Sequence, residues 1–396
     1  MTQLNPALWQ DRPGLPRLLT VLGAAEGDTR IVGGAVRDWL LNLPVSDIDI
    51  ATRLLPDAVM ARLAAAGIKS IPTGLQHGTV TAVVDGRPHE ITTLRRDIET
   101  HGRHATVAFT DDWQADAARR DFTINALYAD PVSGSVTDYF TGLADLSTRT
   151  VRFIGDARTR IAEDHLRILR FFRFSARFSD HLEPAGLLAC AERANDLMAL
   201  SRERIRDELL KLLALPAPAP TIAAMLAHGI LAPILPEITG TAALEALIAA
   251  EAAATVSPGP IRRLAALLPE KPAIAADIAV RLKLSNAEKA RLTEAADRTP
   301  VPADPRALAY AIGADAALDR LLLTNDPRAP HWAGPLRDWP RPRLPISGKD
   351  LIAMGLPPGP AVSRKLAEVE SRWIAAGFPA SQPATLAIAR EILGIR

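Results

Sequence analysis

The 396-residue chain is poor in cysteine and lacks any long uncharged run of apolar residues. Its one cysteine, Cys190 in LLACAER, excludes an intramolecular disulfide, and we expect a buried thiol in a reducing compartment. Without an uncharged apolar stretch of about 18 residues, a membrane-spanning helix is not expected. The opening MTQLNPALWQDRPG has no basic start followed by an apolar run, so we expect no secretory signal. These features predict a cytoplasmic protein with no membrane partner.

The chain also lacks an excess of charge of either sign, since 46 basic residues face 45 acidic ones. A surface that is basic throughout is therefore excluded, and any contact with nucleic acid must come from local patches. Arginine outnumbers lysine 39 to 7, which suits recognition of bases and phosphates but is more simply explained by a coding bias. The length predicts two to four domains, and the hydrophobic content of 48% is typical of a folded protein.

Strand and helix signals alternate over roughly the first 130 residues. TVTAVV and HEITTL have the composition of strands, and Asp85 and Gly86 between them predict a hairpin. Before them, PDAVMARLAAAG predicts a helix that begins near Pro56 and ends at Gly67. The polar stretch RRDIETHGRHATVAF has the composition of a flexible segment. We expect an α+β region with a sheet of four to six strands.

Beyond about residue 155 the pattern is almost entirely helical. Proline-rich stretches interrupt it at LPAPAPT, PEKPA and TPVPADPRA, which we interpret as turns between helices. There is no obvious internal repeat and no low-complexity tail. The sequence therefore predicts a mixed N-terminal domain followed by an elongated array of helices.

Two glycines and an arginine in IVGGAVRD follow a predicted strand and open a predicted helix. Gly33 and Gly34 would let the backbone approach a ligand closely, and the helix N-terminus would offer N–H groups to an anion. Arg37 would add a fixed cation. Taken alone, a simple tight turn explains the glycines equally well. Together with the aspartates that follow, they indicate a phosphate cradle beside a metal site.

Asp47 and Asp49 alternate with isoleucines in DIDI, and a strand would place both carboxylates on one face. Neighbouring carboxylates repel unless a cation neutralises them, although an edge strand can also carry two exposed acids. Mg²⁺ suits this site because it prefers oxygen ligands and binds phosphates. Two-metal transfer usually needs a third carboxylate. Glu90 is the first candidate, with an exposed strand glutamate as the alternative reading, and Asp121 is its competitor.

A second constellation is IAEDHLRILRFFRFSARF, which we interpret as one helix. Arg167, Arg170, Arg173 and Arg177 recur at spacings of three, three and four, so they lie on one helical face. Asp164 lies one turn before the first of them. An aspartate and an arginine together can read the edge of a nucleotide base. An ordinary salt-bridged helix is an equally good reading of the arginines by themselves.

Taken together, these stretches resemble the nucleotidyltransferase family that contains bacterial CCA-adding tRNA nucleotidyltransferases and poly(A) polymerases, class II of the DNA polymerase β-like superfamily. The matching stretches follow the family's order from residue 31 to residue 213. They are IVGGAVRD, SDIDIAT, HEITTLRRD, RRDFTINALY, DYFTGLADL, VRFIGDARTRIAEDHLRILRFFRF and SRERIRDELLKLL.

The resemblance implies an α+β N-terminal nucleotidyltransferase, with a palm-like mixed sheet and helices, followed by an elongated all-α C-terminal region. It implies a catalytic head over residues 1–130 and a helical neck over 131–213 that recognises the base. A helical RNA-binding body would follow over 214–300, and a helical tRNA-binding tail over 301–396.

The resemblance also implies roles for individual residues. Asp47 and Asp49 would bind Mg²⁺, with Glu90 or Asp121 as the third carboxylate. The family's flexible loop, thought to help the switch from CTP to ATP, corresponds to about residues 95 to 108. The implied nucleotide-binding residues are Gly33, with Gly34 and Arg37 for the triphosphate, and Arg120, Asp121 and Asn125 for ribose and phosphates. Asp164 and Arg167 would read the base, and Arg170 and Arg173 would complete that pocket.

The function implied is template-independent addition of CMP, CMP and AMP to the 3′ end of tRNA, from CTP and ATP, with release of pyrophosphate. A poly(A) polymerase or an A-adding tRNA nucleotidyltransferase shares these motifs and is the main alternative. A catalytically inactive RNA-binding protein is the remaining one. The oligomeric state is left open by the sequence.

Overall fold

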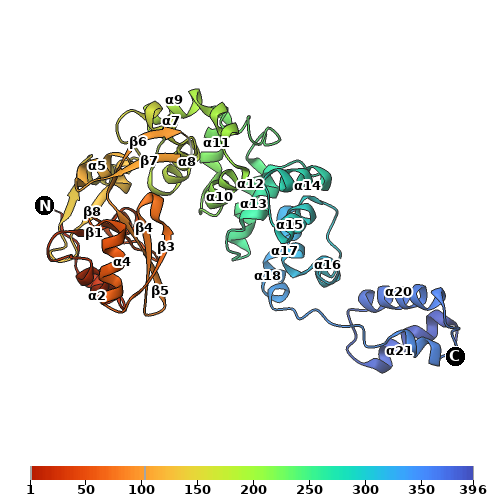
Figure 1. The fold of residues 1–396 in the computed structure, drawn as a ribbon. Coiled ribbons are helices and arrows are strands. Elements are labelled where there is room, and N and C mark those ends of the chain that lie inside the picture. Colours follow the sequence, from red (N-terminus) through yellow and green to blue (C-terminus); the bar gives the residue numbers. More distant parts are fainter. Residues whose placement is uncertain (1, 102–103, 396) are drawn as a thin grey trace. The chain divides into compact units, whose positions relative to one another are not determined.

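The computed structural model describes residues 2–101 and 104–395, and the side chains of 97–107 lie outside the described part. The chain divides into two compact units, and their helices and strands are drawn in Figure 1. The first comprises Met1–Leu212 and Pro220–Pro236, and the second comprises Leu213–Ala219 and Glu237–Arg396. The finer division into head, neck, body and tail stays a prediction.

Seven strands form the main sheet of the first unit, in the order β3-β4-β5-β2-β1-β8-β9. β2 and β5 pair in parallel and the other neighbours pair antiparallel, so the predicted mixed sheet is confirmed. The predicted count of four to six strands is wrong, because β3 lacks apolar alternation and β8 and β9 are very short. The strands are β1 (Thr29–Val32), β2 (Asp49–Thr52), β3 (Lys69–Gly74), β4 (Thr79–Val84), β5 (Arg87–Thr93), β8 (Leu127–Ala129) and β9 (Val136–Asp138).

The predicted hairpin between β4 and β5 is confirmed. Asp85 and Gly86 connect the two strands with φ angles of 49° and 76°, a left-handed pair typical of a two-residue turn. The predicted helix before it is α4 (Pro56–Ala65), and Gly67 follows its end with φ of 67°. Local turn chemistry therefore explains both features.

The polar segment after β5 forms a second, two-stranded antiparallel sheet. It consists of β6 (Arg95–His101) and β7 (His104–Phe109). The flexible loop implied by the family resemblance covers these two strands, and residues 102–103 lie outside the described residues. The backbone pairing thus replaces the irregular segment that composition predicts.

Helices cover both faces of the main sheet. On one face, Trp113 of α5 packs with Val32, Ala51 and Tyr128. The opposite face carries the buried isoleucines of β1, β2 and β5, and α4 packs on this sheet at β3 and β4. The helices of this unit are α1 (Ala7–Gln10), α2 (Leu15–Val21), α3 (Gly34–Leu40), α4, α5 (Trp113–Ala118), α6 (Gly142–Ser147), α7 (Ala157–Glu163), α8 (Leu166–Phe178) and α9 (Pro184–Glu192), with 3-10 turns η1 (Leu75–His77), η2 (Thr123–Asn125) and η3 (Ala194–Ala199).

Phenylalanines attach α8 to the rest of the first unit. Phe122 lies 4.9 Å from Phe153 and 5.3 Å from Phe174 between ring centroids, and Phe171 stacks on Phe153 at 5.5 Å. Burying one such ring contributes about 1.5–3 kcal/mol. The aromatic residues therefore fix the helix that carries the arginine series. In α9, Cys190 is fully buried, as predicted.

The single helix predicted over residues 161–178 is wrong at one position. α7 ends at Glu163, and Asp164 has an extended backbone with φ −150° and ψ 106° before α8 begins at Leu166. The Asp164 carboxylate accepts the backbone N–H of Leu166 at 3.1 Å, which satisfies one free donor of the new helix. A capping contact therefore replaces helical continuity.

The described part of the second unit is helical, which confirms the helical prediction beyond residue 155. None of the helices described combines the length and apolar character required to cross a bilayer. α10 (Arg202–Leu213) and α11 (Ala219–Ala227) lie where the two units alternate along the chain. The others are α12 (Ala242–Ala253), α13 (Pro260–Leu267), α14 (Pro272–Arg281), α15 (Asn286–Ala296), α16 (Pro305–Ile312), α17 (Ala314–Leu323), α18 (Ala329–Arg337), α19 (Gly348–Ala353), α20 (Pro360–Ala375) and α21 (Gln382–Leu393).

A cluster of charged side chains is buried in the second unit. Arg262 of α13 donates to Glu251 of α12 at 2.8 Å and to Asp319 of α17 at 2.7 Å. Arg263 donates to the other oxygen of Glu251 at 2.8 Å and to the carbonyl of Leu213. We call Glu251, Arg262, Arg263 and Asp319 the buried ionic cluster, since each is at most 2% exposed.

Candidate active site

The sheet register places two acidic side chains next to each other. Ile50 of β2 pairs in parallel with Ile91 of β5, so Asp49 and Glu90, one residue earlier on each strand, share the opposite face. Asp47 precedes β2, and Ile48 between the two aspartates is buried. The predicted burial of the isoleucines in DIDI is therefore confirmed, whereas the strand begins only at Asp49 and does not include Asp47.

The electrostatics at Asp49 favour a nearby cation. Its side chain is open to solvent, yet the surrounding protein displaces part of its hydration. This burial raises the pKa of Asp49 above its ordinary value, and the Glu90 carboxylate raises it further. Arg120 opposes the rise, and Asp47 adds a smaller increase. The ionised carboxylates repel one another here, and a divalent cation would relieve that repulsion.

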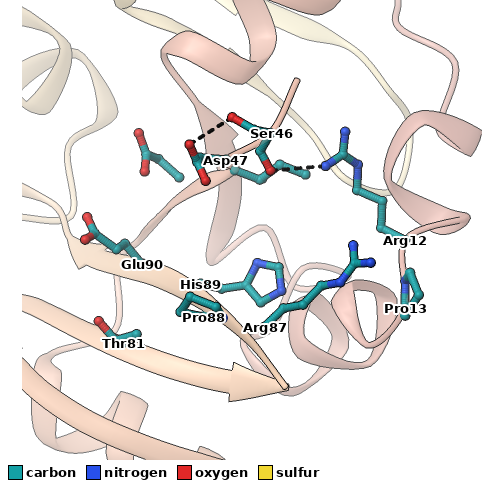
Figure 2. Close-up of a pocket in the computed structure, with 11 residues that line it drawn as sticks. Arg12, Pro13, Ser46, Asp47, Thr81, Arg87, Pro88, His89 and Glu90 are labelled. Carbon is teal, nitrogen blue, oxygen red and sulfur yellow. Dashed lines mark hydrogen bonds between the residues drawn. The ribbon is translucent and has the colours of Figure 1, made fainter. Parts of the chain in front are cut away.

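A cavity of about 580 Å³ lies in front of these carboxylates (Figure 2), and we call it the carboxylate pocket. Arg12, from the segment between α1 and α2, reaches its wall. Its guanidinium donates to the backbone carbonyls of Val45 at 2.6 Å and Ser46 at 3.4 Å, directly before Asp47. The pocket is lined by Arg12, Pro13, Ser46, Asp47, Ile48, Asp49, Thr81, Arg87, Pro88, His89 and Glu90.

A second cavity, of about 420 Å³, adjoins Asp49, and we call it the arginine pocket. Asp49 lines both cavities, so they meet at this carboxylate. Every nucleotide-binding residue predicted from the sequence, except Arg173, lines the arginine pocket. Its lining is Gly33, Gly34, Arg37, Asp49, Arg119, Arg120, Asp121, Asn125, Asp164, Arg167, Arg170 and Phe174.

The glycine pair forms the turn between β1 and α3. Gly33 has φ of 73°, a conformation that favours glycine, while Gly34 has an ordinary helical start. The Arg37 guanidinium is buried, donates to Asp38 at 2.7 Å and to Asn125, and lies 4.1 Å from the Phe178 ring centroid. Burial lowers the pKa of Arg37, against the opposing effect of Asp38. The fixed cation predicted from the sequence is therefore held on several sides.

One buried aspartate orients two of the pocket arginines. Asp116 of α5, 1% exposed, accepts from Arg119 at 2.8 Å, from Arg120 at 3.1 Å and from the Tyr128 hydroxyl at 2.7 Å. Burial alone would raise the pKa of Asp116, but Arg119, Arg120 and Tyr128 outweigh it and lower that pKa to about 2. Asp116 also accepts the backbone N–H of Arg95, the first residue of β6.

Asp121 is occupied by partners inside the protein. It accepts from Arg170 at 2.6 Å, from the Asn125 amide at 3.0 Å and from the backbone N–H of Phe122 at 2.8 Å. Burial would raise the pKa of Asp121, and Arg170 and Asn125 lower it overall. Glu90, by contrast, lies beside Asp49 on the same sheet face. The geometry therefore favours Glu90 over Asp121 as the third carboxylate.

The helix break places Asp164 and Arg167 on the wall of the arginine pocket. Arg204 of α10 donates to the Asp164 carboxylate at 2.7 Å. Arg167 donates to the Glu163 carboxylate and, at 2.9 Å, to the backbone carbonyl of Arg119. Both predicted base-reading residues are thus held by neighbours from other segments.

Arg173 lies apart from the residues that line the pocket. Its guanidinium donates to Glu208 of α10 at 2.6 Å and lies 4.4 Å from the centroid of the Phe174 ring, which does line the pocket. Arg177 pairs with Asp38 at 3.3 Å. The arginine series on α8 therefore divides between residues that border the cavity and residues that hold the helix to its neighbours.

Sequence reasoning missed several residues of this arrangement. Arg119 and Phe174 line the pocket, although both occur inside the motifs that carried the resemblance. Arg204 and Glu208 contact the pocket residues Asp164 and Arg170, at 2.7 Å and 3.9 Å. Both come from SRERIRDELLKLL, a matching stretch to which no role is given by the sequence. Asp116 has no signal in the sequence, since its partners become neighbours only through the fold.

In the part of the chain that the structure describes, no three or more His, Cys, Asp or Glu side chains are grouped closely enough to hold a metal ion by themselves. Asp47 and Asp49 nevertheless supply carboxylate oxygens, the ligands that Mg²⁺ prefers. Such an ion usually keeps water and takes further oxygens from substrate phosphates, so two protein carboxylates suffice. The donor set and its repulsion therefore fit a divalent cation.

Comparison with known proteins agrees with this site. A family model described as the poly(A) polymerase head domain matches residues 29–152. A second, described as the probable RNA- and SrmB-binding site of polymerase A, matches residues 181–240. The main sheet and the pocket residues from Gly33 to Asn125 lie within the first of these ranges. Arg12, Pro13 and the pocket residues from Asp164 to Phe174 lie outside both.

Similar proteins extend the comparison over most of the chain. The CCA tRNA nucleotidyltransferase 1, mitochondrial, of Danio rerio is 36% identical over 385 residues, covering 91% of this chain and 86% of that protein. The human protein of the same name is 47% identical over 205 residues, which is 50% of this chain and 47% of its own length.

A solved structure of the Bacillus stearothermophilus CCA-adding enzyme in complex with CTP superimposes with a TM-score of 0.77. It is 28% identical and covers 96% of this chain and 98% of its own. A Thermotoga maritima CCA-adding enzyme complexed with tRNA, 19% identical with a TM-score of 0.69, shares the fold. The motifs, the fold and the likeness over nearly the whole length show that the chain belongs to the nucleotidyltransferase family of CCA-adding enzymes and poly(A) polymerases.

Proposed function

We propose that this chain adds CMP, CMP and AMP in turn to the 3′ end of tRNA, using CTP and ATP and releasing pyrophosphate. The observation that carries the proposal is the meeting of the arginine pocket and the carboxylate pocket at Asp49. Phosphoryl transfer needs cations around the phosphates and carboxylates beside the reacting phosphorus. The relatives named for CCA addition and the relative solved with CTP support the same activity.

In this proposal the arginine pocket binds the nucleoside triphosphate. Gly33, Gly34 and Arg37 hold the triphosphate at the start of α3, where backbone N–H groups are free. Arg120, fixed by Asp116, presents its charge towards the phosphates beside Asp49. The remaining nucleotide contacts come from Asp121 and Asn125 to the sugar, and from Asp164, Arg167 and Arg170 to the base. Arg173 does not line the pocket and acts on it through the Phe174 ring.

Asp47 and Asp49 would hold Mg²⁺, with Glu90 beside them. When bound, the ion supplies neutralisation of phosphate charge and lowers the pKa of a coordinated hydroxyl. The carboxylates orient the 3′ end of the RNA acceptor, and its hydroxyl attacks the α-phosphate while pyrophosphate leaves on the opposite side. Positioning by fixed side chains provides most of the acceleration.

A tRNA transcript that lacks its last three nucleotides tests the proposed function. It is incubated with Mg²⁺ and CTP alone, ATP alone, or both, and the products are sized on a gel. Two additions from CTP and one more from ATP are expected. Long tails from ATP on unrelated RNA would make the chain a poly(A) polymerase. Addition only to RNA already ending in CC would make it an A-adding enzyme, and no addition at all would contradict the proposal.

We also propose a cytoplasmic location on the basis of composition. The vertebrate relatives are named as mitochondrial proteins, so a mitochondrial location is the alternative. Fractionation of cells that express the tagged chain, with cytoplasmic and organelle markers, distinguishes the two.

A further inference from the structure

Two arginines face the carboxylates across the carboxylate pocket. In Figure 2, Asp47 and Glu90 lie towards one side, Arg12 and Arg87 towards the other, and His89 lies between Glu90 and Arg87. The Nε2 atom of His89 is buried without a hydrogen-bond partner among the described residues. Burial lowers the pKa of His89, and the charges of Arg12 and Arg87, which line the same cavity, lower it further.

These two arginines have no acidic partner in the described part of the chain. Arg12 donates only to backbone carbonyls, at Leu8, Val45 and Ser46. Arg87 is exposed at the start of β5, and no ion pair or hydrogen bond of its side chain occurs among those residues. Two neighbouring cations without a counter-ion repel each other and attract an anion.

The position of this cation pair fits the attacking side of the reaction. An in-line displacement places the nucleophile and the leaving group on opposite sides of the phosphorus. If the triphosphate occupies the arginine pocket, pyrophosphate leaves there, and the attacking hydroxyl must arrive through the other cavity at Asp49. A strand of RNA brings a phosphodiester one nucleotide behind its terminal hydroxyl.

We infer that Arg12 and Arg87 bind the phosphodiester that joins the last two nucleotides of the RNA acceptor, and so position its 3′ end against Asp49. This inference rests on the proposed function, since it requires an RNA acceptor. Arg12 has a second task, because its bonds to Val45 and Ser46 also fix the backbone that carries Asp47. Arg87 has no such bond and is the cleaner test.

The first experiment compares wild type with Arg87→Ala in steady-state incorporation of CTP into truncated tRNA. We expect the KM for the RNA to rise about tenfold, as for loss of one charge-assisted contact, while the KM for CTP stays unchanged. The slope of log KM for RNA against log salt should fall by about 0.7. An increase in the KM for CTP instead would assign the anion site to the nucleotide, and an unchanged KM for RNA would overturn the inference.

Arg62→Ala is the matched control. Arg62 is an exposed arginine of α4 that lies 3.8 Å from Asp28 and lines neither pocket. Its replacement by alanine therefore removes one positive charge from the same unit but outside both pockets. We expect its RNA kinetics to equal wild type. Arg87→Lys should recover part of the RNA affinity, since the charge returns without the two-pronged geometry. An equal rise in the KM for RNA in the Arg62→Ala and Arg87→Ala variants would contradict a specific RNA-binding site at Arg87.

A substrate with a neutral methylphosphonate at its last internucleotide linkage identifies the phosphate itself. Wild type should lose about tenfold in kcat/KM on this RNA, whereas Arg87→Ala should lose little more, because the contact is already absent. Additive losses would overturn the assignment to this linkage. If wild type transferred nucleotides to none of the RNAs, the proposed function would be contradicted. If wild type and Arg87→Ala transferred equally well, only the inference about Arg87 would be contradicted.

Discussion

Both units contain networks of arginines and carboxylates, but the networks differ in how far their arginine side chains are exposed. In the buried ionic cluster of the second unit, Arg262 and Arg263 are each 2% exposed, and carboxylates or carbonyls take their N–H groups. In the first unit, the side chains of Arg120 and Arg170 pair with carboxylates too, yet they are 19% and 31% exposed and border a cavity.

This difference separates a structural network from a binding one. In a buried ion pair the electrostatic attraction mainly offsets the cost of removing both charges from water. A fully buried cluster therefore has no free N–H group with which to bind a ligand. Cations at the wall of a cavity keep one side free, and a phosphate that displaces water there gains charge-assisted hydrogen bonds. An arginine-rich sequence therefore indicates a phosphate site only where the fold leaves a cavity beside it.

The largest expected effect separates charge needed for chemistry from charge needed for folding. Asp49→Asn should reduce nucleotide transfer about a thousandfold, because loss of a metal-binding carboxylate removes several kcal/mol of transition-state stabilisation. In the presence of a chelator the same variant should melt at a higher temperature than wild type, since it removes a carboxylate whose ionisation is opposed by burial and by the charge of Glu90. Asp57→Asn, at an exposed position of α4, serves as control for both assays. Unchanged transfer would contradict the metal assignment.

A substitution in the buried ionic cluster should lower stability and leave nucleotide transfer unchanged. Asp319→Asn removes the carboxylate that pairs with Arg291 and one of the two that pair with Arg262, the other being Glu251. We expect the free energy of unfolding to fall by about 4 kcal/mol. Calorimetry measures the loss. The kcat for CTP incorporation by the folded variant should equal wild type well below its melting temperature. A reduced kcat with unchanged stability would mean that this cluster acts in catalysis.

Asp116 is itself buried, like the residues of the buried ionic cluster, but it holds arginines that line the arginine pocket. Its replacement therefore tests whether it supports catalysis or only the fold. Asp116→Asn should lower kcat/KM for CTP by up to about a hundredfold, since Arg119 and Arg120 lose the group that orients them. Binding of RNA, measured separately by filter retention, should change little. A variant that loses stability but keeps its kcat/KM for CTP would show that Asp116 supports only the fold.

Acid titration gives a smaller effect with a defined sign. The pKa of Asp116 in the folded protein, about 2, lies below its ordinary value of 3.8. The ionised carboxylate therefore stabilises the fold at pH above 4, and this contribution, about 2 kcal/mol, disappears as the pH falls from about 4 to 2. Unfolding curves of wild type and Asp116→Asn should converge over this range. Parallel curves would contradict the assignment.

The smallest effect concerns competition between protons and the metal. Because the pKa of Asp49 is raised, protonation should weaken metal binding at mildly acidic pH. Raising the Mg²⁺ concentration should move the acidic limb of the kcat/KM profile to lower pH. A limb that does not respond to Mg²⁺ would mean that another group controls it.

Local patterns in the sequence predicted the parts of the site that depend on neighbouring residues. The alternation in DIDI predicted that Ile48 and Ile50 are buried, and Asp85–Gly86 predicted the β4–β5 turn. The positions of Asp49 and Glu90 on adjacent strands also required the parallel register of β2 and β5. That register comes from tertiary packing, which explains why Asp121 remained a competitor.

Long-range contacts account for the failures. The helix over 161–178 appeared continuous because its apolar period is unbroken. At the break, Asp164 caps Leu166 and also accepts from Arg204, forty residues away in the chain. Arg173 belonged to the same helical face as Arg170, but Glu208 holds its guanidinium away from the cavity lining. Individual side-chain partners at such separations leave no periodic signal in a sequence.

The burial of Cys190 has a practical consequence for spectroscopy. Burial raises the pKa of its thiol well above the ordinary value, so thiolate-specific reagents will find almost no reactive sulfur in the folded protein. A cysteine introduced at an exposed position would therefore be labelled selectively, with no prior removal of the native residue. Paired probes placed in this way, one in each unit, would report by energy transfer how the distance between the units responds to CTP, ATP and RNA.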